Sequence, residues 1–403
     1  MKRPYICAVI GKNFGDEGKG LAVDYLSLQA KGGPVLVIRH NGGAQSGHTV
    51  DLPDKRFVFH ELSSGSFRRA DTFWAETFYP DMYKLREEAE SFRIVGGFVP
   101  KIYTHPDAQI TLIDDVLLNM AAEENRGNAR HGSCGMGIYE AQCRGRAGFG
   151  ITMRELFAMN VLDFVSRMQE IRKEYLPKRM KELRLSREIP GEYKELLQSD
   201  EVLKNAAIEI LSNLIYVQLA GDVKGLMEGY DRVIFESGQG LLLDEDNERF
   251  APHVTASRTG LQNPCAFLSK YHMAPDEVIY VTRSYVTRHG AGPLPYECSA
   301  AELGIGGTDR TNVDNPWQGA LRFALHGSVE EFVEPVLEDL KVAESYRVLP
   351  PYRNLMVTHL NETAGCLFTK EGKIPLDEFS SNTMIEDVFN RFYASSTYYA
   401  EDI

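Results

Sequence analysis

The 403-residue chain has few cysteines, and none of them are spaced for a metal or redox motif. No Cys-x-x-Cys pair occurs among the six scattered cysteines, Cys7, Cys134, Cys143, Cys265, Cys298 and Cys366. Structural zinc sites use closely spaced cysteines, and small secreted domains use cysteine pairs as a disulfide framework. We therefore expect a reduced, cytoplasmic protein with neither disulfides nor structural zinc.

Long apolar runs are also missing, and none approaches the ~20 residues that span a bilayer. The N-terminal sequence MKRPYICAVIGKNFG begins with two basic residues, but its apolar run is short and charged loop residues follow at once. This pattern does not fit a signal peptide. The sequence predicts a soluble protein without a membrane partner.

Positive charge is in deficit, because 44 Lys and Arg face 57 Asp and Glu, for a formal net charge of −13. Nucleic acid polymers require a basic surface, so this balance argues against them as partners. A local basic pocket for a small anion remains compatible with it. The composition, 43% hydrophobic and 25% charged, is that of a globular protein with one large or two smaller domains.

Short apolar runs, the first of which ends at Gly11, alternate with helix-prone segments along most of the chain. Strands alternating with helices predict an α/β fold with a mostly parallel central sheet flanked by helices, whose ligands gather beyond the carboxyl ends of the strands. The first strand and the helix expected over residues 18–30 are joined by a glycine-rich turn. The expected strands are 5–10, 34–40, 92–98, 110–113, 232–236, 278–282 and 355–358.

Residues 153–228 have a different character, with many charges and apolar residues at three- and four-residue spacing. Pro177 and Pro190 interrupt the pattern. This spacing predicts a helical subdomain beside the sheet, and its charges indicate a solvated face. We expect it to lie within a single domain that spans residues 1–403.

The turn after the first strand, GKNFGDEGKG (11–20), resembles a phosphate loop but departs from its common pattern. Six residues, instead of four, separate Gly11 from Gly18-Lys19. Gly20 stands where a serine or threonine hydroxyl would bind magnesium. A strand-to-helix turn is an anion site, where Lys19 would neutralise phosphate oxygens. Asp16 would repel phosphate unless it serves as a base or a metal ligand. A plain glycine-rich turn with a capping aspartate is the alternative.

A second glycine-rich turn, NGGAQSGHTV (41–50), follows the next expected strand. Its His48 should emerge at the same sheet edge as Asp16, where the pair would suit proton transfer or charge stabilisation. A lone histidine is more often structural. The two turns together favour a reactive site.

Seven ordered segments over residues 5–362 resemble adenylosuccinate synthetase, a ligase family of purine biosynthesis. GDEGKG (15–20) and GHT (47–49) match the two signature turns of that family. HGSCGMGI (131–138) is similar to its GTTGRGIG segment, FESGQGLLLDED (235–246) to FEGAQG and LDID, and PHVTAS (252–257) to PYVTSS. VTRHGAGPLPYE (286–297) is similar to TRVGAGPFPTE, and GTDR (307–310) stands where a TTGR loop belongs.

The resemblance implies a two-step ligation. A base removes the N1 proton of a 6-oxopurine mononucleotide while its O6 attacks the γ-phosphate of a nucleoside triphosphate. The amino group of L-aspartate then displaces phosphate from C6. Asp16 would be the base and a Mg²⁺ ligand together with the Gly47 carbonyl, and His48 would stabilise developing charge.

The same resemblance assigns the remaining site residues individually. A homodimer is implied, in which an arginine of the neighbouring subunit completes the phosphate site. The triphosphate would meet Gly15, Glu17, Gly18, Lys19, Gly20, Thr49, Thr358 and Asn361. The purine mononucleotide would meet Asp16, Gln45, Ser133, Cys134, Arg144, Arg146, Gln239 and Thr255, where Arg144 and Arg146 are alternatives. L-aspartate would meet Thr308, Arg310 and Asn312.

Three departures from the family pattern bear on the substrates. Where the family reads guanine with TKLD, this chain has THLN, and Asn361 lacks the charge for that contact. ATP or dATP therefore becomes a credible donor, and GTP stays open as the alternative. Asn312 replaces the second arginine of the aspartate loop, for which Arg322 could compensate. Cys134 replaces the threonine that contacts the monophosphate.

These departures resemble the 2-aminoadenylosuccinate synthetases of some viruses, which act on dGMP with an ATP-type donor. A viral origin would place the protein in the host cytoplasm. Since Asp16 is retained, IMP and GMP or dGMP both remain open as substrates. The rival hypotheses are a phosphate-loop hydrolase or kinase and a non-catalytic nucleotide-binding protein.

Overall fold

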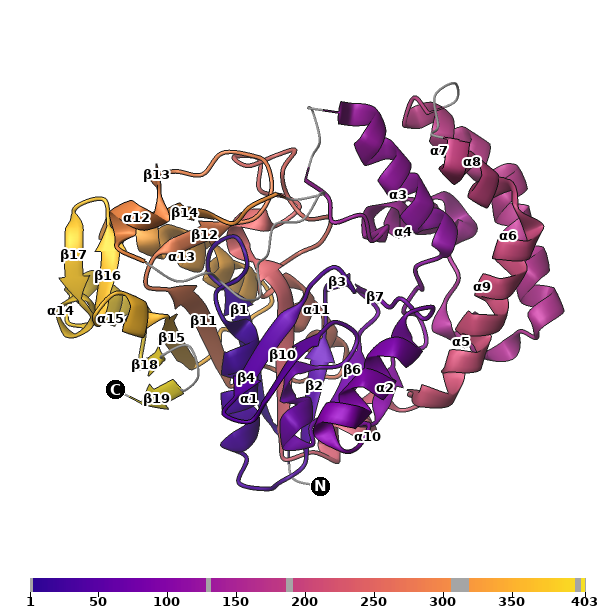
Figure 1. The fold of residues 1–403 in the computed structure, drawn as a ribbon. Coiled ribbons are helices and arrows are strands. Elements are labelled where there is room, and N and C mark those ends of the chain that lie inside the picture. The colour runs from indigo at the N-terminus through magenta and orange to yellow at the C-terminus, as the bar shows by residue number, and fades with distance from the viewer. Residues whose placement is uncertain (1–2, 128–131, 186–190, 306–318, 396–399, 403) are drawn as a thin grey trace.

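The computed structural model describes residues 3–127, 132–185, 191–305, 319–395 and 400–402. Within these residues, ten strands form a central sheet in the order β19-β18-β15-β11-β1-β10-β2-β6-β8-β9 (Figure 1). Nine of them are parallel, and β19 pairs antiparallel at one edge. The predicted α/β class with a mostly parallel sheet is therefore confirmed. The strands are β1 (Tyr5–Gly11), β2 (Val35–Arg39), β6 (Asp71–Trp74), β8 (Ile102–Thr104), β9 (Val217–Leu219), β10 (Arg232–Gly240), β11 (Glu277–Arg283), β15 (Tyr352–Thr358), β18 (Arg391–Ser395) and β19 (Ala400–Asp402).

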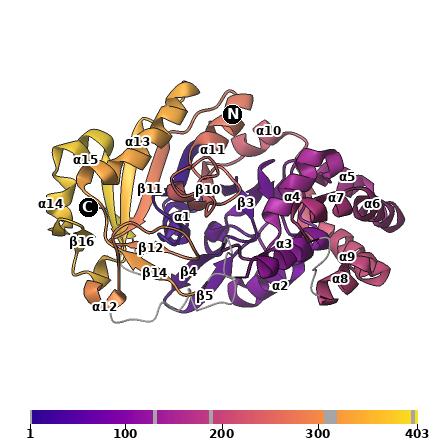
Figure 2. The same cartoon turned by 90° about the horizontal axis from the view of Figure 1, so that it is seen from above.

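Both faces of the sheet are covered, which explains why β1 reads as a continuous apolar run. Ile6, Ala8 and Ile10 belong to a core shared with α11 (Gln262–Lys270) and α13 (Val329–Ser345). The alternate residues Cys7 and Val9 pack with α1 (Lys19–Leu28) on the opposite face. Figure 2 shows α10 (Val223–Glu228), α11 and α13 on one side of the sheet and α1 on the other.

Two expected strands are wrong. Residues 92–96 form the end of helix α2 (Leu85–Gly96), whose buried Leu85, Ala89 and Phe92 recur at helical spacing, and residues 97–98 follow it. The short apolar run is ambiguous without the residues that precede it. Residues 110–113 are irregular and lead into helix α3 (Ile113–Arg126). The strands β6, β8, β9, β18 and β19 of the central sheet were not predicted.

Helices gather beside the β9 edge of the sheet, at the right of Figure 1. Their apolar residues, such as Phe164 and Ile210, share one core with Trp74 and Phe92. Residues 153–228 also contain β9 and α10, which belong to the sheet and its cover, and the subdomain boundaries stay a prediction. The helices here are α3, α4 (Ile138–Arg144), α5 (Met153–Ala158), α6 (Val161–Glu174), α7 (Leu176–Glu182), α8 (Gly191–Gln198) and α9 (Asp200–Ser212).

Small sheets and short helices at the strand ends complete the described chain. A β4–β5 hairpin begins at His48, and β12, β14 and β13 form a three-stranded sheet in that order. No described helix is both long and apolar enough to cross a membrane. The elements are β3 (Gly42–Gly43), β4 (His48–Leu52), β5 (Lys55–Phe59), β7 (Phe78–Tyr79), β12 (Val286–Arg288), β13 (Glu297–Cys298), α12 (Ala300–Leu303), β14 (Arg322–Ala324), β16 (Cys366–Thr369), β17 (Gly372–Pro375), α14 (Leu376–Ser380) and α15 (Thr383–Val388).

Candidate active site

A large cavity of about 1250 Å³ opens beyond the carboxyl ends of β1, β10, β11 and β15, where ligands of parallel sheets bind. Both glycine-rich turns line it. Further lining comes from segments far apart in the sequence, including residues 132–140, 238–239, 252–256, 283–291 and 359–362. The sequence therefore predicted correctly that the two turns would meet at one edge.

The first turn reverses the chain through left-handed backbone conformations at Gly15 (φ 96°), Asp16 (φ 59°) and Gly18 (φ 94°). Aspartate tolerates this region better than most side chains. A Cβ on Gly18 would lie 3.1 Å from the Thr358 side chain, so glycine is also favoured there by space. The turn delivers the Asp16 carboxylate and the amino end of α1 to the cavity.

Glu17, by contrast, points into the turn. Its carboxylate accepts hydrogen bonds from the main-chain N–H groups of Asn13 (3.0 Å) and Gly15 (2.8 Å). It also forms an ion pair with Lys19 at 2.7 Å. Glu17 is 1% exposed and does not line the cavity, so the structure gives it the role of bracing the turn. Its expected contact with a triphosphate finds no support in this placement.

His48, the first residue of β4, is fixed by Glu236 in β10. The imidazole Nδ1 lies 2.7 Å from Glu236 Oε1, while Nε2 has no hydrogen-bond partner among the described residues, although it is buried in the cavity lining. Ser64 donates a hydrogen bond to the same carboxylate, and Arg39 Nη1 lies 3.7 Å from its other oxygen. This arrangement orients Nε2 for a ligand.

The protonation states of this pair follow from burial and charge. Burial lowers the pKa of the His48 imidazole, an effect that the Glu236 carboxylate opposes but does not cancel. Burial alone would raise the pKa of Glu236, but the hydrogen bonds from His48 and Ser64 and the charge of Arg39 hold it below its usual value. At neutral pH, Glu236 is therefore an anion that accepts from Nδ1–H, and Nε2 carries a lone pair.

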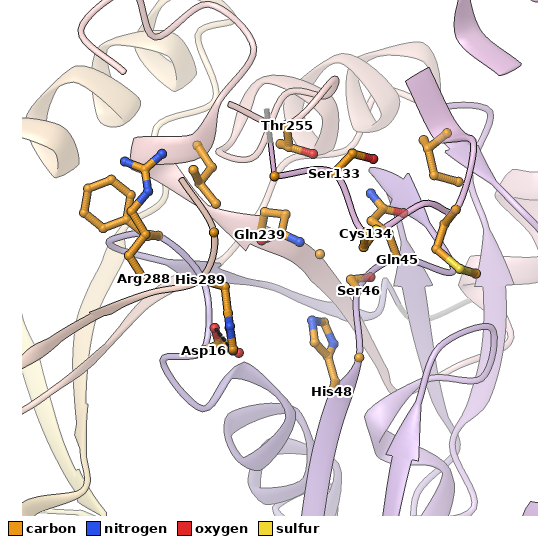
Figure 3. A pocket seen from close by; sticks show the side chains of 18 of the residues that line it. Asp16, Gln45, Ser46, His48, Ser133, Cys134, Gln239, Thr255, Arg288 and His289 are labelled. Atoms are coloured by element: carbon orange, nitrogen blue, oxygen red, sulfur yellow. Dashed lines mark ion pairs between the residues drawn. The ribbon is translucent and has the colours of Figure 1, made fainter. Parts of the chain in front are cut away.

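Figure 3 shows Asp16 on one side of the cavity floor and His48 on the other, with Gln239 between and above them. His289 lies beside Asp16, its Nε2 3.6 Å from the Asp16 carboxylate. His289 was not predicted, although the sequence carries a signal for it, since it replaces the valine of the TRVGAGP segment. Glu236 was also missed, because only the fold brings the middle of β10 to His48.

The far wall of the cavity in Figure 3 carries Ser133, Cys134 and Thr255, and Gln45 also lines the cavity. Helix α3 shapes the turn at 132–137. Asn119 Oδ1 accepts from Ser133 Oγ at 2.8 Å, and Glu123 accepts from the N–H groups of Gly132 and Ser133. The structure thus brings together the residues expected to bind a mononucleotide.

The Cys134 thiol stays neutral in this wall. Burial raises its pKa to about 11. A neutral thiol is a weak hydrogen-bond donor, so Cys134 replaces the hydroxyl of a threonine without adding a charge near an anion.

Arg144 and Arg146, the two alternatives for the phosphate site, differ in burial and in their contacts. Arg144 is 1% exposed and does not line the cavity, because its guanidinium binds Asp115 and the carbonyls of Phe149 and Ile110. Arg146 lines the cavity with a side chain that is 65% exposed, and its contact with Glu245 is a loose 3.6 Å. Of these two alternatives, Arg146 is the one that lines the cavity.

The opposite end of the cavity holds the segment expected to read the donor base. Thr358 is buried, and its hydroxyl donates a hydrogen bond to the Glu17 carbonyl at 2.7 Å, so Thr358 stabilises the main chain of the first turn. Asn361, Thr49, Gly18, Lys19 and Gly20 line the cavity, whereas Gly15 does not. Thr308, Arg310 and Asn312 lie outside the described residues. Arg322 is paired with Glu297.

The oxygen donors in the cavity fit magnesium. Among the described residues, no group of three or more His, Cys, Asp or Glu forms a cage for a metal ion. Magnesium rarely uses such a cage, since it binds one or two carboxylates and completes its shell with water and substrate phosphates. The Asp16 carboxylate and the exposed Gly47 main chain both line the cavity and offer hard oxygen ligands.

Comparison with known proteins gives a consistent result. The model of the family described as "Adenylosuccinate synthetase" matches residues 8–311. Adenylosuccinate synthetases of Gloeobacter violaceus and Thermoplasma acidophilum are each 30% identical over 72% of this chain. That of Acaryochloris marina is 27% identical over 74% of it. The matches span 62%, 63% and 63% of the lengths of these three relatives.

Solved structures share the fold at lower identity. The fully ligated adenylosuccinate synthetase of Plasmodium falciparum superposes with a TM-score of 0.64 at 21% identity, over 88% of this chain and 77% of its own. The succinoaminodeoxyadenylate synthetase of cyanophage S-2L, bound to dGMP and dATP, gives a TM-score of 0.59 at 14% identity, over 100% of this chain and 96% of its own.

Proposed function

The chain belongs to the adenylosuccinate synthetase family, and from this premise we propose that it ligates L-aspartate to C6 of a 6-oxopurine mononucleotide. The proposal rests chiefly on one observation: Asp16 and His48 face the same large cavity from two separate turns, and the His48 Nε2 has no hydrogen-bond partner within the described part of the chain. A non-catalytic nucleotide-binding protein needs neither group there. A nucleoside triphosphate supplies the energy.

In the first step, the Asp16 carboxylate accepts the N1 proton of the purine. The O6 oxygen forms a bond to the γ-phosphorus, and the bond from that phosphorus to the bridging oxygen breaks, which releases the nucleoside diphosphate. The amino group of aspartate then attacks C6, loses a proton, and displaces inorganic phosphate. Bound Mg²⁺, held by Asp16 and the Gly47 carbonyl, would neutralise charge on the phosphate oxygens.

His48 responds to the charge of the phosphoryl group. Its depressed pKa keeps the ring neutral in the free protein, but an anion against Nε2 favours the imidazolium. Glu236 stabilises that cation through Nδ1. The Nε2–H group then donates a hydrogen bond to the oxygen between the purine and the γ-phosphorus as charge develops on that oxygen.

The mononucleotide would lie against Gln239, with its phosphate near Ser133, Cys134 and Thr255. Because Arg146 is exposed and Arg144 is buried, Arg146 is the arginine we propose for a phosphate site, in a homodimer where it serves the neighbouring subunit. A dimer interface would make each cavity complete only in the assembly.

We propose ATP or dATP as the donor, because Asn361 at the base-reading segment lacks the carboxylate that would accept from guanine N1 and N2. The mononucleotide is IMP, or GMP or dGMP. The Asp16 carboxylate accepts from N1–H in either class, and a 2-amino group offers it a second donor.

The deciding experiment measures phosphate release with Mg²⁺ and crosses IMP, GMP and dGMP with ATP and GTP, each with and without L-aspartate. We expect release that requires both a mononucleotide and aspartate, and that is faster with ATP. Steady triphosphate hydrolysis without aspartate would instead identify a hydrolase or kinase built on a related turn. Nucleotide binding without turnover in every combination would identify a binding protein.

A further inference from the structure

The main chain of Asp16 is held from the far end of the cavity. Arg283, the last residue of β11, donates from Nε to the Asp16 carbonyl at 2.5 Å. Its Nη1 donates to the Tyr285 hydroxyl at 3.1 Å, and that hydroxyl donates to Glu362 Oε2 at 2.5 Å. Three hydrogen bonds therefore connect the proposed base to a residue 346 positions away.

Glu362 ends the short helix Leu360–Glu362, which contains Asn361. This is the segment proposed to read the donor base, and both residues line the cavity. Glu362 is only half-buried, whereas Tyr285 and Arg283 are 1% and 5% exposed. The connection thus starts at the donor end of the cavity and continues through buried groups.

The Asp16 end of the connection is the part of the turn that most needs support. Asp16 has a left-handed backbone at φ 59°, which for a residue other than glycine is stable only where neighbours hold it. The next carbonyl, that of Glu17, accepts from Thr358 Oγ1 at 2.7 Å. Two successive carbonyls of the turn are therefore anchored to residues that adjoin the base-reading segment.

The Tyr285 hydroxyl is the joint of this connection. It accepts from the Arg283 guanidinium and donates to the Glu362 carboxylate, so it links two groups of opposite charge. The ring is also packed, with centroids 6.0 Å from Phe323 and 6.2 Å from His359. A tyrosine that only filled the core would need the ring but not the hydroxyl.

We propose that Tyr285 is a positioning residue, which fixes the geometry of Asp16 relative to the donor end of the cavity through Arg283 and Glu362. This inference rests on the proposed function and names residues that carry no chemistry themselves. A displaced Asp16 would still permit both nucleotides to bind, but the carboxylate would meet the purine in a poorer orientation. Loss of the connection should therefore appear in kcat more than in KM.

The first test is Tyr285→Phe, which removes the hydroxyl and keeps the ring. We expect kcat for aspartate-dependent phosphate release to fall about tenfold or more, with the KM of the mononucleotide changed by less than about threefold. Tyr271→Phe is the matched control, since the Tyr271 hydroxyl contacts His105 at 3.4 Å outside the cavity. An unchanged kcat in Tyr285→Phe, or an equal loss in Tyr271→Phe, would overturn the proposal.

The second test uses Glu362, whose partial exposure makes misfolding of a variant a small concern. Glu362→Ala should resemble Tyr285→Phe, whereas Glu362→Gln keeps an acceptor for the Tyr285 hydroxyl and should lose less kcat than Glu362→Ala. The double variant Tyr285→Phe/Glu362→Ala should lose no more than either single variant, because both break one connection. Additive losses would show that the two side chains act separately and would overturn the proposal.

The outcomes separate this inference from the function on which it rests. A wild-type protein without aspartate-dependent phosphate release would refute the proposed function. A wild-type protein with that activity, together with a Tyr285→Phe variant that loses only thermal stability, would refute the positioning role alone.

Discussion

The two turns that meet in the cavity hold their reactive side chains in opposite ways. In the second turn, His48 is buried and fixed through its own ring by Glu236, which Ser64 and Arg39 hold in turn. In the first turn, the Asp16 side chain is 25% exposed and, within the described part of the chain, forms an ion pair only with His289, at 3.6 Å, whereas a short hydrogen bond from Arg283 holds its main chain. A group that must exchange a proton and meet a metal benefits from an open carboxylate, whereas a group that stabilises charge benefits from preorganisation.

Among the variants that test this difference between the two turns, we expect the largest effect from Asp16→Asn. Asparagine tolerates the left-handed backbone and keeps a similar shape, so the turn should survive while the base is lost. We expect kcat to fall by about 10²–10⁴-fold, with mononucleotide affinity retained within a few fold by calorimetry. Asp107→Asn, on the exposed surface, is the control. Loss of binding together with turnover would assign Asp16 a structural or metal role.

Glu236→Gln addresses the second turn. The amide can donate to Nδ1 and so favour the wrong tautomer of His48, and it no longer balances a cationic ring. We expect kcat to fall about a hundredfold. Because Glu236 is fully buried beside Arg39, thermal unfolding must be followed in parallel. A folded variant with wild-type kcat would show that preorganisation of His48 is unimportant.

Asn361→Asp tests the donor end, to which the first turn is anchored. A carboxylate there would accept from guanine N1 and N2, so the ratio of kcat/KM for GTP over ATP should rise about tenfold, equivalent to about 1.4 kcal/mol. Competition between the two donors at limiting mononucleotide measures the ratio. An unchanged ratio would place base reading elsewhere.

The smallest expected effect concerns pH and the strand that precedes the second turn. His40 is fully buried with neither ring nitrogen hydrogen-bonded among the described residues, and burial, aided by the charge of Arg39, lowers its pKa to about 3. Below pH 6.5 the His40 imidazole is protonated in the unfolded chain but stays neutral in the folded chain. The free energy of unfolding should therefore fall by about 1 kcal/mol from this group between pH 7 and 5.5.

His40→Phe should remove that contribution and flatten the dependence of the urea midpoint on pH between 7 and 5.5. His272→Asn is the control, because His272 is exposed and asparagine tolerates its φ of 56°. A slope in His40→Phe as steep as that of the wild type would show that His40 is not the source of the acid sensitivity.

The sequence was sufficient where chemistry is encoded locally. The turns that carry Asp16 and His48 are recognisable because each is glycine-rich and follows a short apolar run. Strand 92–98 failed because a seven-residue apolar run does not distinguish a strand from the last turns of an amphipathic helix, whereas Leu85 and Ala89 upstream do.

Contacts made across the fold could not be predicted. Glu17 lies beside Asp16 in sequence, yet its side chain points into the turn, because two main-chain N–H groups and Lys19 bind its carboxylate inside the turn. Arg144 and Arg146 are equivalent in sequence, and only the burial of Asp115 in α3 shows that Arg144 is already engaged. Neither the partner of His48 nor the Tyr285 connection has a signature in spacing.

The inward carboxylate of Glu17 has a consequence for how nucleotides are received. Many anion-binding loops lie open until a phosphate arrives to draw their amide groups inward, and each binding event then costs conformational entropy. Here an internal anion already occupies that position among the amides of Asn13 and Gly15. Glu17 therefore holds the first turn in its shape before a nucleotide binds, so nucleotide binding does not have to order the main chain of this turn.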